Sequence, residues 1–182
     1  DTDRSRGLGD VYKRQDMAKV IFAPNKLDKD KFTVFLAGSI DMGKAKDWQQ
    51  EIEDKLKDED VILFNPRRPD WDSSWEESIT NPQFREQVEW ELNALEEADM
   101  IVVYFDPKGK APITLMELGL HKDDKMVVCC PNGYHKKGNV DVVCHKYNIK
   151  QVDDIDGLVK EIKTEAFTLD ESICNKFKHL IK

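Results

Sequence analysis

Short apolar runs, each closed by polar or loop-forming residues, recur along the chain from Phe32 onward. Runs that are rich in β-branched and aromatic residues and bounded by Gly, Pro, Asn or Asp are typical of buried strands. This pattern predicts strands over residues 32–37, 61–64, 100–105, 125–130 and 151–152. Because the runs are apolar throughout rather than alternating, we expect a parallel sheet covered on both faces.

The segments between those runs favour helices, over residues 45–57, 84–97, 114–122 and 155–166, with a short one over 170–182. Residues 140–147 could be helical or extended. The apolar residues that recur at helical spacing, and are expected to face the core, are Trp48, Ile52 and Leu56, then Val88, Leu92 and Leu95, then Leu158, Val159 and Ile162. Strands alternating with helices predict a single-domain α/β sandwich with a parallel sheet, of the flavodoxin-like or Rossmann-like type.

A Gly-Ser turn follows the first predicted strand, at Gly38, Ser39 and Ile40. A strand, a tight turn and then a helix place backbone N–H groups and a hydroxyl at a helix N-terminus. Such a terminus favours a phosphate, a carboxylate or a sugar hydroxyl. A plain tight turn without a ligand is an equal alternative, because the sequence has no P-loop motif here.

The loop after the second strand is rich in Arg, Asp and Trp. Trp71 and Trp75 could stack on a base, and Arg67 or Arg68 could hold a phosphate or orient a carboxylate. Loops at strand ends are where binding sites are usually built. The alternative is a surface loop held by its own aromatic contacts and Arg–Asp pairs.

Two glutamates stand out as candidate reacting groups. Glu117 lies among Leu115, Met116 and Leu118 in the helix that follows the strand at 100–105, where open α/β sheets bind ligands. Glu91 falls on the predicted inward stripe of the preceding helix. A carboxylate beside an apolar face needs a partner or a function, although a solvated Glu on a charged helix remains the simpler alternative.

Composition excludes several classes of protein. The chain has 182 residues, 35% of them charged, and a net charge of -8, which argues against a general nucleic-acid binder. No apolar run is long enough to span a bilayer, so we expect no membrane contact. The four cysteines form no CxxC motif, and Cys129 and Cys130 lie in an apolar run and are expected to be buried free thiols. We expect a cytoplasmic protein with neither a metal site nor a cofactor. Residues 1–16 are predicted to be a non-native or disordered leader before a domain at 17–182.

Five motifs in order resemble the nucleoside 2-deoxyribosyltransferase family, and most closely its deoxyribosyltransferase-like branch. They are FLAGSI at 35–40, NPRRPDWD at 65–72, FREQVEWELNALEEADMIVVYF at 84–105, PITLMELGLH at 112–121 and PNGYHKKGNVDVVC at 131–144. Each motif is weak alone, and the ordered set is fairly specific.

The resemblance implies a role for several residues. Glu117 corresponds to the nucleophile of the family's MELG or YELG motif, and Glu91 to a second acid that is more often Asp. Gly38, Ser39 and Ile40 would contribute to sugar or phosphate binding. Asn139 would complete a neighbouring subunit's site in a homo-oligomer.

The chain departs from the family pattern at two places. The first strand reads Val34-Phe35-Leu36 and lacks the tyrosine that bonds the nucleophile in many members, so the nucleophile would be oriented differently. The aspartate that handles the base before the nucleophile motif is also missing. Base recognition would then differ, through Asp70, Asp72 or Asp106.

N-glycosidic cleavage itself needs two such acids. One carboxylate attacks the anomeric carbon, and a second group donates a proton to the leaving base. We therefore expect an ionised Glu117 as nucleophile of a small-molecule nucleoside or nucleotide and Glu91 as an orienting or proton-handling group. Three functions remain open: a deoxyribosyltransferase, an N-glycosidase that hydrolyses a nucleoside or a nucleoside 5′-monophosphate, and a nucleotide-sensing module without turnover.

Overall fold

The computed structural model describes residues 17–40, 47–122 and 125–178, with side chains as far as residue 169. Its centre is a six-stranded sheet in the order β1-β3-β2-β4-β5-β6, in which every neighbouring pair is parallel. The strands are β1 (Lys19–Phe22), β2 (Phe32–Gly38), β3 (Val61–Asn65), β4 (Met100–Tyr104), β5 (Met126–Cys129) and β6 (Lys150–Val152). The predicted parallel sheet is confirmed.

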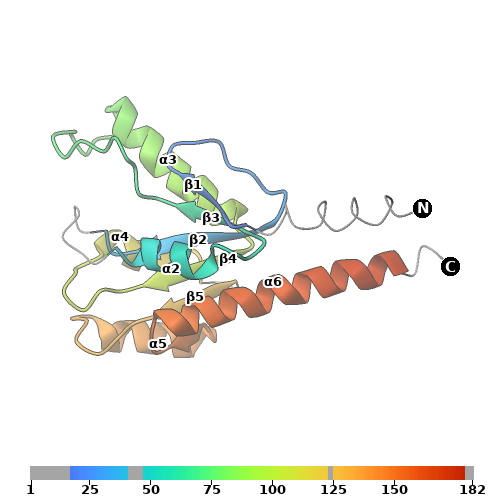
Figure 1. Cartoon of the computed structure of the whole chain (residues 1–182). Coiled ribbons are helices and arrows are strands. Elements are labelled where there is room, and N and C mark those ends of the chain that lie inside the picture. The colour runs from blue at the N-terminus through green and yellow to red at the C-terminus, as the bar shows by residue number, and fades with distance from the viewer. Residues whose placement is uncertain (1–16, 41–46, 123–124, 179–182) are drawn as a thin grey trace.

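Helices cover both faces of the sheet (Figure 1). They are α2 (Trp48–Leu56), α3 (Pro82–Glu97), α4 (Pro112–Leu120), α5 (Lys137–Tyr147) and α6 (Ile155–Lys178). One hydrophobic cluster packs α3, α4 and α5 on one face, and a second packs α2 and α6 on the other. This is the predicted α/β sandwich, because each apolar strand face needs a covering layer.

The strand order creates a switch point between β2 and β4. From β2 the chain first crosses to β3 on one side and then returns to β4 on the other side. In open parallel sheets, ligands bind at the carboxyl ends of the strands where the order reverses in this way. The Gly38-Ser39 turn ends β2 and α4 follows β4, so both candidate segments leave the sheet at this switch point.

Some element boundaries differ from those expected. β1 was not predicted, because it is a four-residue edge strand in which only Ile21 is fully buried. Residues 140–147, for which the sequence allowed a helix or an extended segment, are helical and form part of α5. The last two predicted helices form one continuous helix, α6, which extends to Lys178, and Leu158, Val159 and Ile162 are buried as expected.

The buried face of α3 is rotated relative to the predicted stripe. Leu95 is fully buried, but Leu92 is 37% exposed and Val88 is only half-buried. The residues that face the sheet are instead Gln87, Trp90, Ala94 and Leu95. Glu91 lies beside this set by helical position and is half-buried.

Candidate active site

The turn after β2 is joined tightly to the end of β4. The Ser39 N–H donates to the Tyr104 carbonyl (3.2 Å), and the Trp48 indole N–H donates to the Ser39 carbonyl (3.1 Å). A Cβ at Gly38 would lie 2.5 Å from the Tyr104 carbonyl oxygen and 2.7 Å from the Trp48 ring, so only glycine fits. The expected turn is therefore present, and it connects β2, β4 and α2 at the switch point of the sheet.

Asp106 is the first polar residue after β4, and its backbone contacts the same turn. Its backbone N–H donates to the Ser39 hydroxyl (3.2 Å), and its carboxylate accepts from the Lys108 N–H (2.8 Å). Both Ser39 and Asp106 are buried. Because the Ser39 oxygen accepts this bond, its hydroxyl proton is available for a neighbouring acceptor. Ile40 is half-buried beside it.

Helix α4 carries Glu117 and begins abruptly. Ala111 precedes it in the left-handed region (φ 45°), which is unfavourable for a residue with a Cβ, and Pro112 occupies the first turn. Glu117 is a buried polar residue with 6% of its surface exposed. The nearby strand β2 supplies only buried apolar side chains at Val34, Phe35 and Leu36, as the sequence implied.

Glu117 and Glu91 form an electrostatic pair. Burial, followed by the negative charge of Glu91, raises the pKa of Glu117 to about 8. Burial raises the pKa of Glu91 to about 7, against the opposing effect of a hydrogen bond from Gln87. Two interacting carboxylates titrate as a unit, so this pair retains a proton near neutral pH. The pKa of Glu117 lies above neutral, so the ionised Glu117 expected of the nucleophile is the minor form in the free protein at pH 7.

Gln87 positions Glu91 and was missed by sequence reasoning. Its side-chain amide donates to the Glu91 carboxylate (2.8 Å) and to the Pro66 carbonyl (2.7 Å). It stands one helical turn before Glu91, and this four-residue spacing is the one signal that could have identified it. Gln87 thus links the carboxyl end of β3 to the second acid.

The predicted aromatic and charged loop after β3 is held largely by its own contacts. The Arg68 guanidinium, whose side chain is 7% exposed, pairs with Asp70 and Glu86 and stacks over Trp75. Trp71 meets Trp75 edge to face at 5.1 Å. The Asp72 carboxylate accepts from the Ser74 N–H (2.8 Å). These are the contacts expected of a self-pinned surface loop.

Arg67 differs from Arg68, because it turns away from that loop. Its guanidinium Nε donates to the Gln49 side-chain carbonyl and pairs with the Asp47 carboxylate, both at 3.1 Å. Its backbone N–H is held by the Asn65 side chain (2.9 Å). Arg67 therefore joins the end of β3 to the first turn of α2.

Asn139 lies apart from these contacts, in the first turn of α5. It is exposed, and its backbone N–H donates to the Lys136 carbonyl (2.9 Å). An exposed side chain is the arrangement that a residue directed to another subunit requires.

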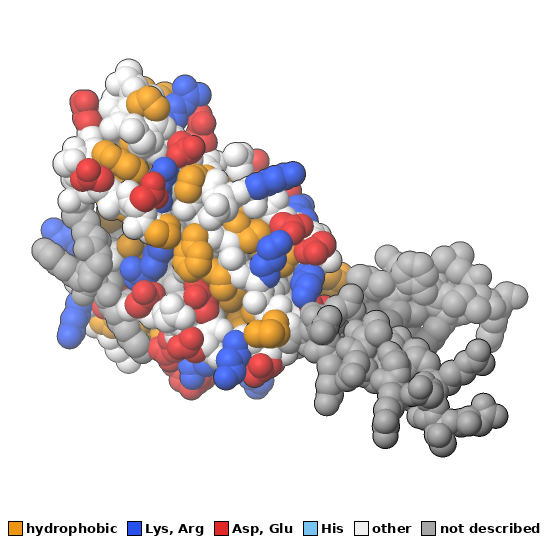
Figure 2. Space-filling view, turned by 45° about the horizontal axis from the view of Figure 1, so that its top comes forward, with side chains coloured by type: hydrophobic (Ala, Val, Ile, Leu, Met, Phe, Trp, Pro, Cys, Tyr) orange, Lys and Arg blue, Asp and Glu red, His pale blue; other side chains and the backbone are white. Residues whose placement is uncertain are grey.

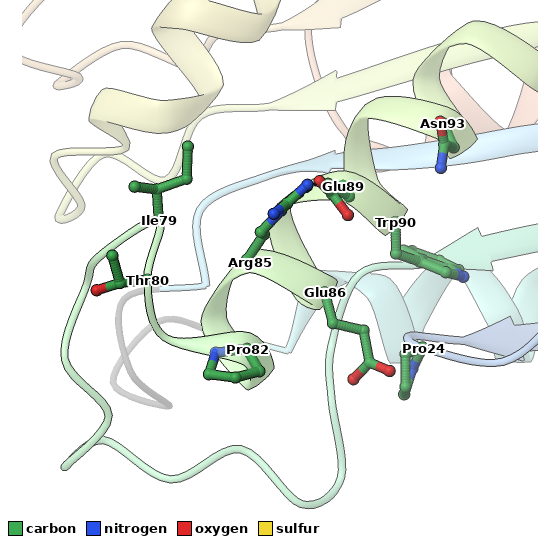
Figure 3. A pocket seen from close by; sticks show the side chains of 9 residues that line it. All are labelled: Pro24, Ile79, Thr80, Pro82, Arg85, Glu86, Glu89, Trp90 and Asn93. Atoms are coloured by element: carbon green, nitrogen blue, oxygen red, sulfur yellow. Dashed lines mark hydrogen bonds and ion pairs between the residues drawn. The ribbon is translucent and has the colours of Figure 1, made fainter.

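A hollow of about 730 Å³ runs beside α3, but it is not the site of the acid pair. Figure 3 shows its lining, from Pro24 after β1 and Ile79 and Thr80 in the loop to Arg85, Glu89 and Trp90 on α3. The Arg85 guanidinium bonds Glu89 across its wall (2.6 Å). Neither Glu91 nor Glu117 lines this hollow. On the face of the molecule shown in Figure 2, charged and apolar side chains are interspersed.

Cys129 and Cys130 are free and buried, as expected, and Cys144 is free and buried as well. Burial raises the pKa of Cys129 to about 12, and those of Cys130 and Cys144 to about 11, so these thiols are unreactive at neutral pH. Within residues 17–40, 47–122 and 125–178, no cluster of His, Cys, Asp or Glu is arranged to hold a metal ion. The same residues contain no helix with the length and hydrophobicity needed to cross a bilayer.

Comparison with known proteins supports the resemblance noted in the sequence. A family model described as nucleoside 2-deoxyribosyltransferase like matches residues 31–134. A solved structure, described as a conserved protein from Enterococcus faecalis V583, is 15% identical, covering 74% of this chain and 99% of that one with a TM-score of 0.50. That likeness concerns the fold alone. No curated protein matches the chain.

Proposed function

Because the chain belongs to the nucleoside 2-deoxyribosyltransferase-like family, we propose that it cleaves the N-glycosidic bond of a nucleoside or nucleotide with Glu117 as nucleophile. The observation that carries this proposal is the coupled pair of a buried Glu117 and a half-buried Glu91, on the helices that follow and precede β4. Perturbed carboxylates beside a strand-end crevice are typical of sites that do acid–base and covalent chemistry.

The pair supplies both groups that the reaction needs, a carboxylate nucleophile and a proton donor. With its proton on Glu91, the ionised Glu117 carboxylate attacks the anomeric carbon, and the C–N bond electrons leave with the base. The Glu91 proton moves to the base as that bond breaks, and a glycosyl ester remains on Glu117. A second base or water then attacks the ester, with Glu91 accepting the incoming proton.

Burial contributes to this chemistry in two ways. A desolvated carboxylate is a stronger nucleophile than a hydrated one, and the oxocarbenium-like charge of the transition state interacts strongly with it. The hydrogen bond from the Gln87 side-chain amide holds the carboxylate of Glu91, which stands where family members more often have Asp. Ser39 and Asp106 offer polar atoms for the sugar on the other wall of the crevice.

The three candidate functions are separated by one experiment. The protein is incubated with a panel of nucleosides and nucleoside 5′-monophosphates, with and without a second free base. We expect glycosidic cleavage, and Glu117→Gln should lower its rate at least about 10³-fold because covalent catalysis is lost. A new nucleoside identifies a transferase, and free base alone identifies a hydrolase. Binding without any product would overturn the enzymatic proposal in favour of a sensor.

Two further proposals concern the setting of the site. We propose a homo-oligomer in which Asn139 completes a neighbouring site, supported by the exposure of Asn139 on α5. We also propose a cytoplasmic location, supported by the free thiols. The predicted leader at residues 1–16 lies outside the described residues.

A further inference from the structure

Three buried polar atoms in the described part of the chain lack a hydrogen-bond partner, and all three belong to one network. They are Gln49 Nε2, Arg67 Nη2 and Gln87 Oε1. Arg67 contacts Gln49 directly, and Gln87 contacts Pro66, the residue before Arg67. Unpaired buried polar groups are costly and uncommon, so three in one place indicate a network that is incomplete without a further polar group.

The unpaired atoms of Gln49 and Arg67 are both donors. The Arg67 Nε–H can bond only an acceptor, so the Gln49 carbonyl oxygen must face it, as it does at 3.1 Å. Reversing the amide would set two donors against each other. Gln49 is fully buried. Its NH2 group has no hydrogen-bond partner, and neither has Nη2 of the Arg67 guanidinium. Two donors from different elements therefore await an acceptor oxygen.

This donor pair is connected to both walls of the site. Gln49 follows Trp48, whose indole is bonded to the Ser39 carbonyl in the turn after β2. Arg67 follows Pro66, whose carbonyl is bonded by Gln87, the partner of Glu91. The pair thus lies at the carboxyl end of β3, beside the strand whose turn carries Ser39.

Charge favours a neutral acceptor over an anionic one. The guanidinium of Arg67 already has a carboxylate partner in Asp47, 3.1 Å away. A phosphate would add negative charge next to that carboxylate, whereas a carbonyl oxygen accepts two donors without a net-charge penalty. In a nucleoside or nucleotide, the neutral acceptor oxygens with carbonyl character belong to the base.

We propose that Gln49 and Arg67 donate hydrogen bonds to a carbonyl oxygen of the leaving base, and that the enzyme therefore prefers oxo bases to adenine. This inference rests on the proposed glycosidic cleavage. As the C–N bond breaks, its electron pair passes to the base, and an oxo base places part of that charge on its carbonyl oxygen. Donors fixed at that oxygen stabilise the departing base, since they interact most strongly in the transition state.

Hypoxanthine and adenine nucleosides provide the test, because they differ only at C6, carbonyl against amino, and in the N1 hydrogen that accompanies the carbonyl. Inosine and adenosine are compared in ribose and 2′-deoxyribose forms, each with and without a 5′-phosphate. We expect kcat/KM to favour the oxo base roughly 10-fold or more, because the amino group leaves both donors unpaired. Gln49→Met and Arg67→Lys should reduce that ratio towards one. Gln50→Met, at an exposed neighbour that bonds Asp54, should leave it unchanged.

Other outcomes would overturn the proposal. If both substitutions slow the oxo and amino substrates equally, the donors do not contact the base. If they abolish only a preference for the 5′-phosphate, the donors hold phosphate. Thermal unfolding of each variant identifies loss of folding, and Arg67→Lys keeps the test available if Gln49→Met does not fold.

Binding separates this proposal from the proposed function. Calorimetric titration of the Glu117→Gln protein with the same nucleosides measures base preference without turnover. A preference for the oxo base that Gln49→Met removes supports the donor pair even if Glu117 proves not to be the nucleophile. Equal affinity for both bases in that variant would contradict the donor pair even if cleavage through Glu117 is established.

Discussion

At the scale of single residues, the most informative feature is the protonation of Glu117. Its position after β4 and its spacing were visible in the sequence, but its pKa depends on burial and on the charge of Glu91. A pKa of about 8 keeps the carboxyl neutral in most free molecules at pH 7, so the attacking carboxylate forms when the proton is on Glu91 or has left the pair. Activity should accordingly fall when the pair is fully protonated.

The same pKa predicts how stability depends on pH. Below pH 4 the Glu117 carboxyl is neutral in both folded and unfolded chains. From about 4.5 to about 8 the unfolded chain loses this proton while the folded chain keeps it, so wild-type stability falls as pH rises through this range. Glu117→Gln should remove the part of that fall due to Glu117 and leave the part due to Glu91, with a gain over wild type on the order of 4 kcal/mol at pH 8.

Urea unfolding at pH 5, 6, 7 and 8 measures this effect. Glu96→Gln, an exposed substitution on α3, serves as the surface control. Parallel stability profiles for wild type and Glu117→Gln would show that Glu117 is not destabilised by its site, and would contradict the buried acid pair.

At the scale of elements, sequence periodicity predicted the buried helix residues correctly where a regular helix face packs on the sheet. Trp48, Ile52 and Leu56 are fully buried on α2 because one helix face meets the sheet without interruption. On α3 the same reasoning chose Leu92, yet Trp90 and Ala94 are the buried residues. The Trp90 indole N–H donates to the Asn25 carbonyl (2.7 Å), a contact between distant parts of the chain that periodicity does not reveal. Phe35 of β2 contacts Trp90 at a ring distance of 6.5 Å.

Site residues with a local sequence signal were predicted, and those defined by long-range contacts were not. Glu91, Glu117, Ser39 and Arg67 were identifiable because each stands at a strand end or on an apolar face. Gln49 was not, because its contact with Arg67 joins residues 18 positions apart and no repeat relates them. Arg68 and Arg67 were indistinguishable in the sequence. Only the fold shows that the Arg68 guanidinium already pairs with Asp70 and Glu86 and stacks on Trp75.

At the scale of the whole molecule, α4 exposes an apolar stripe. Ile113, Met116 and Leu120 are 56%, 50% and 58% exposed, at three- and four-residue spacing on the helix that carries Glu117. Such a stripe favours association with another subunit, and it supports the proposed homo-oligomer with shared sites.

Mixing two inactive variants tests shared sites. Glu117→Gln and Asn139→Ala subunits each lack one part of a site, so both should be inactive as pure proteins. If Asn139 acts across an interface, a mixture of the two contains some sites with both native residues, and a random dimer would regain about one quarter of wild-type activity. Activity no higher than the sum of the separate variants would show that Asn139 does not act across an interface.

The central claim is that Glu117 becomes covalently bonded to the sugar. Rapidly quenched wild-type enzyme, mixed with excess substrate and digested, is analysed by mass spectrometry. We expect one added sugar residue on the peptide that contains Glu117, formed within the first turnover and absent from Glu117→Gln. A sugar adduct on another residue, or base release in the first turnover without any adduct, would contradict nucleophilic attack by Glu117.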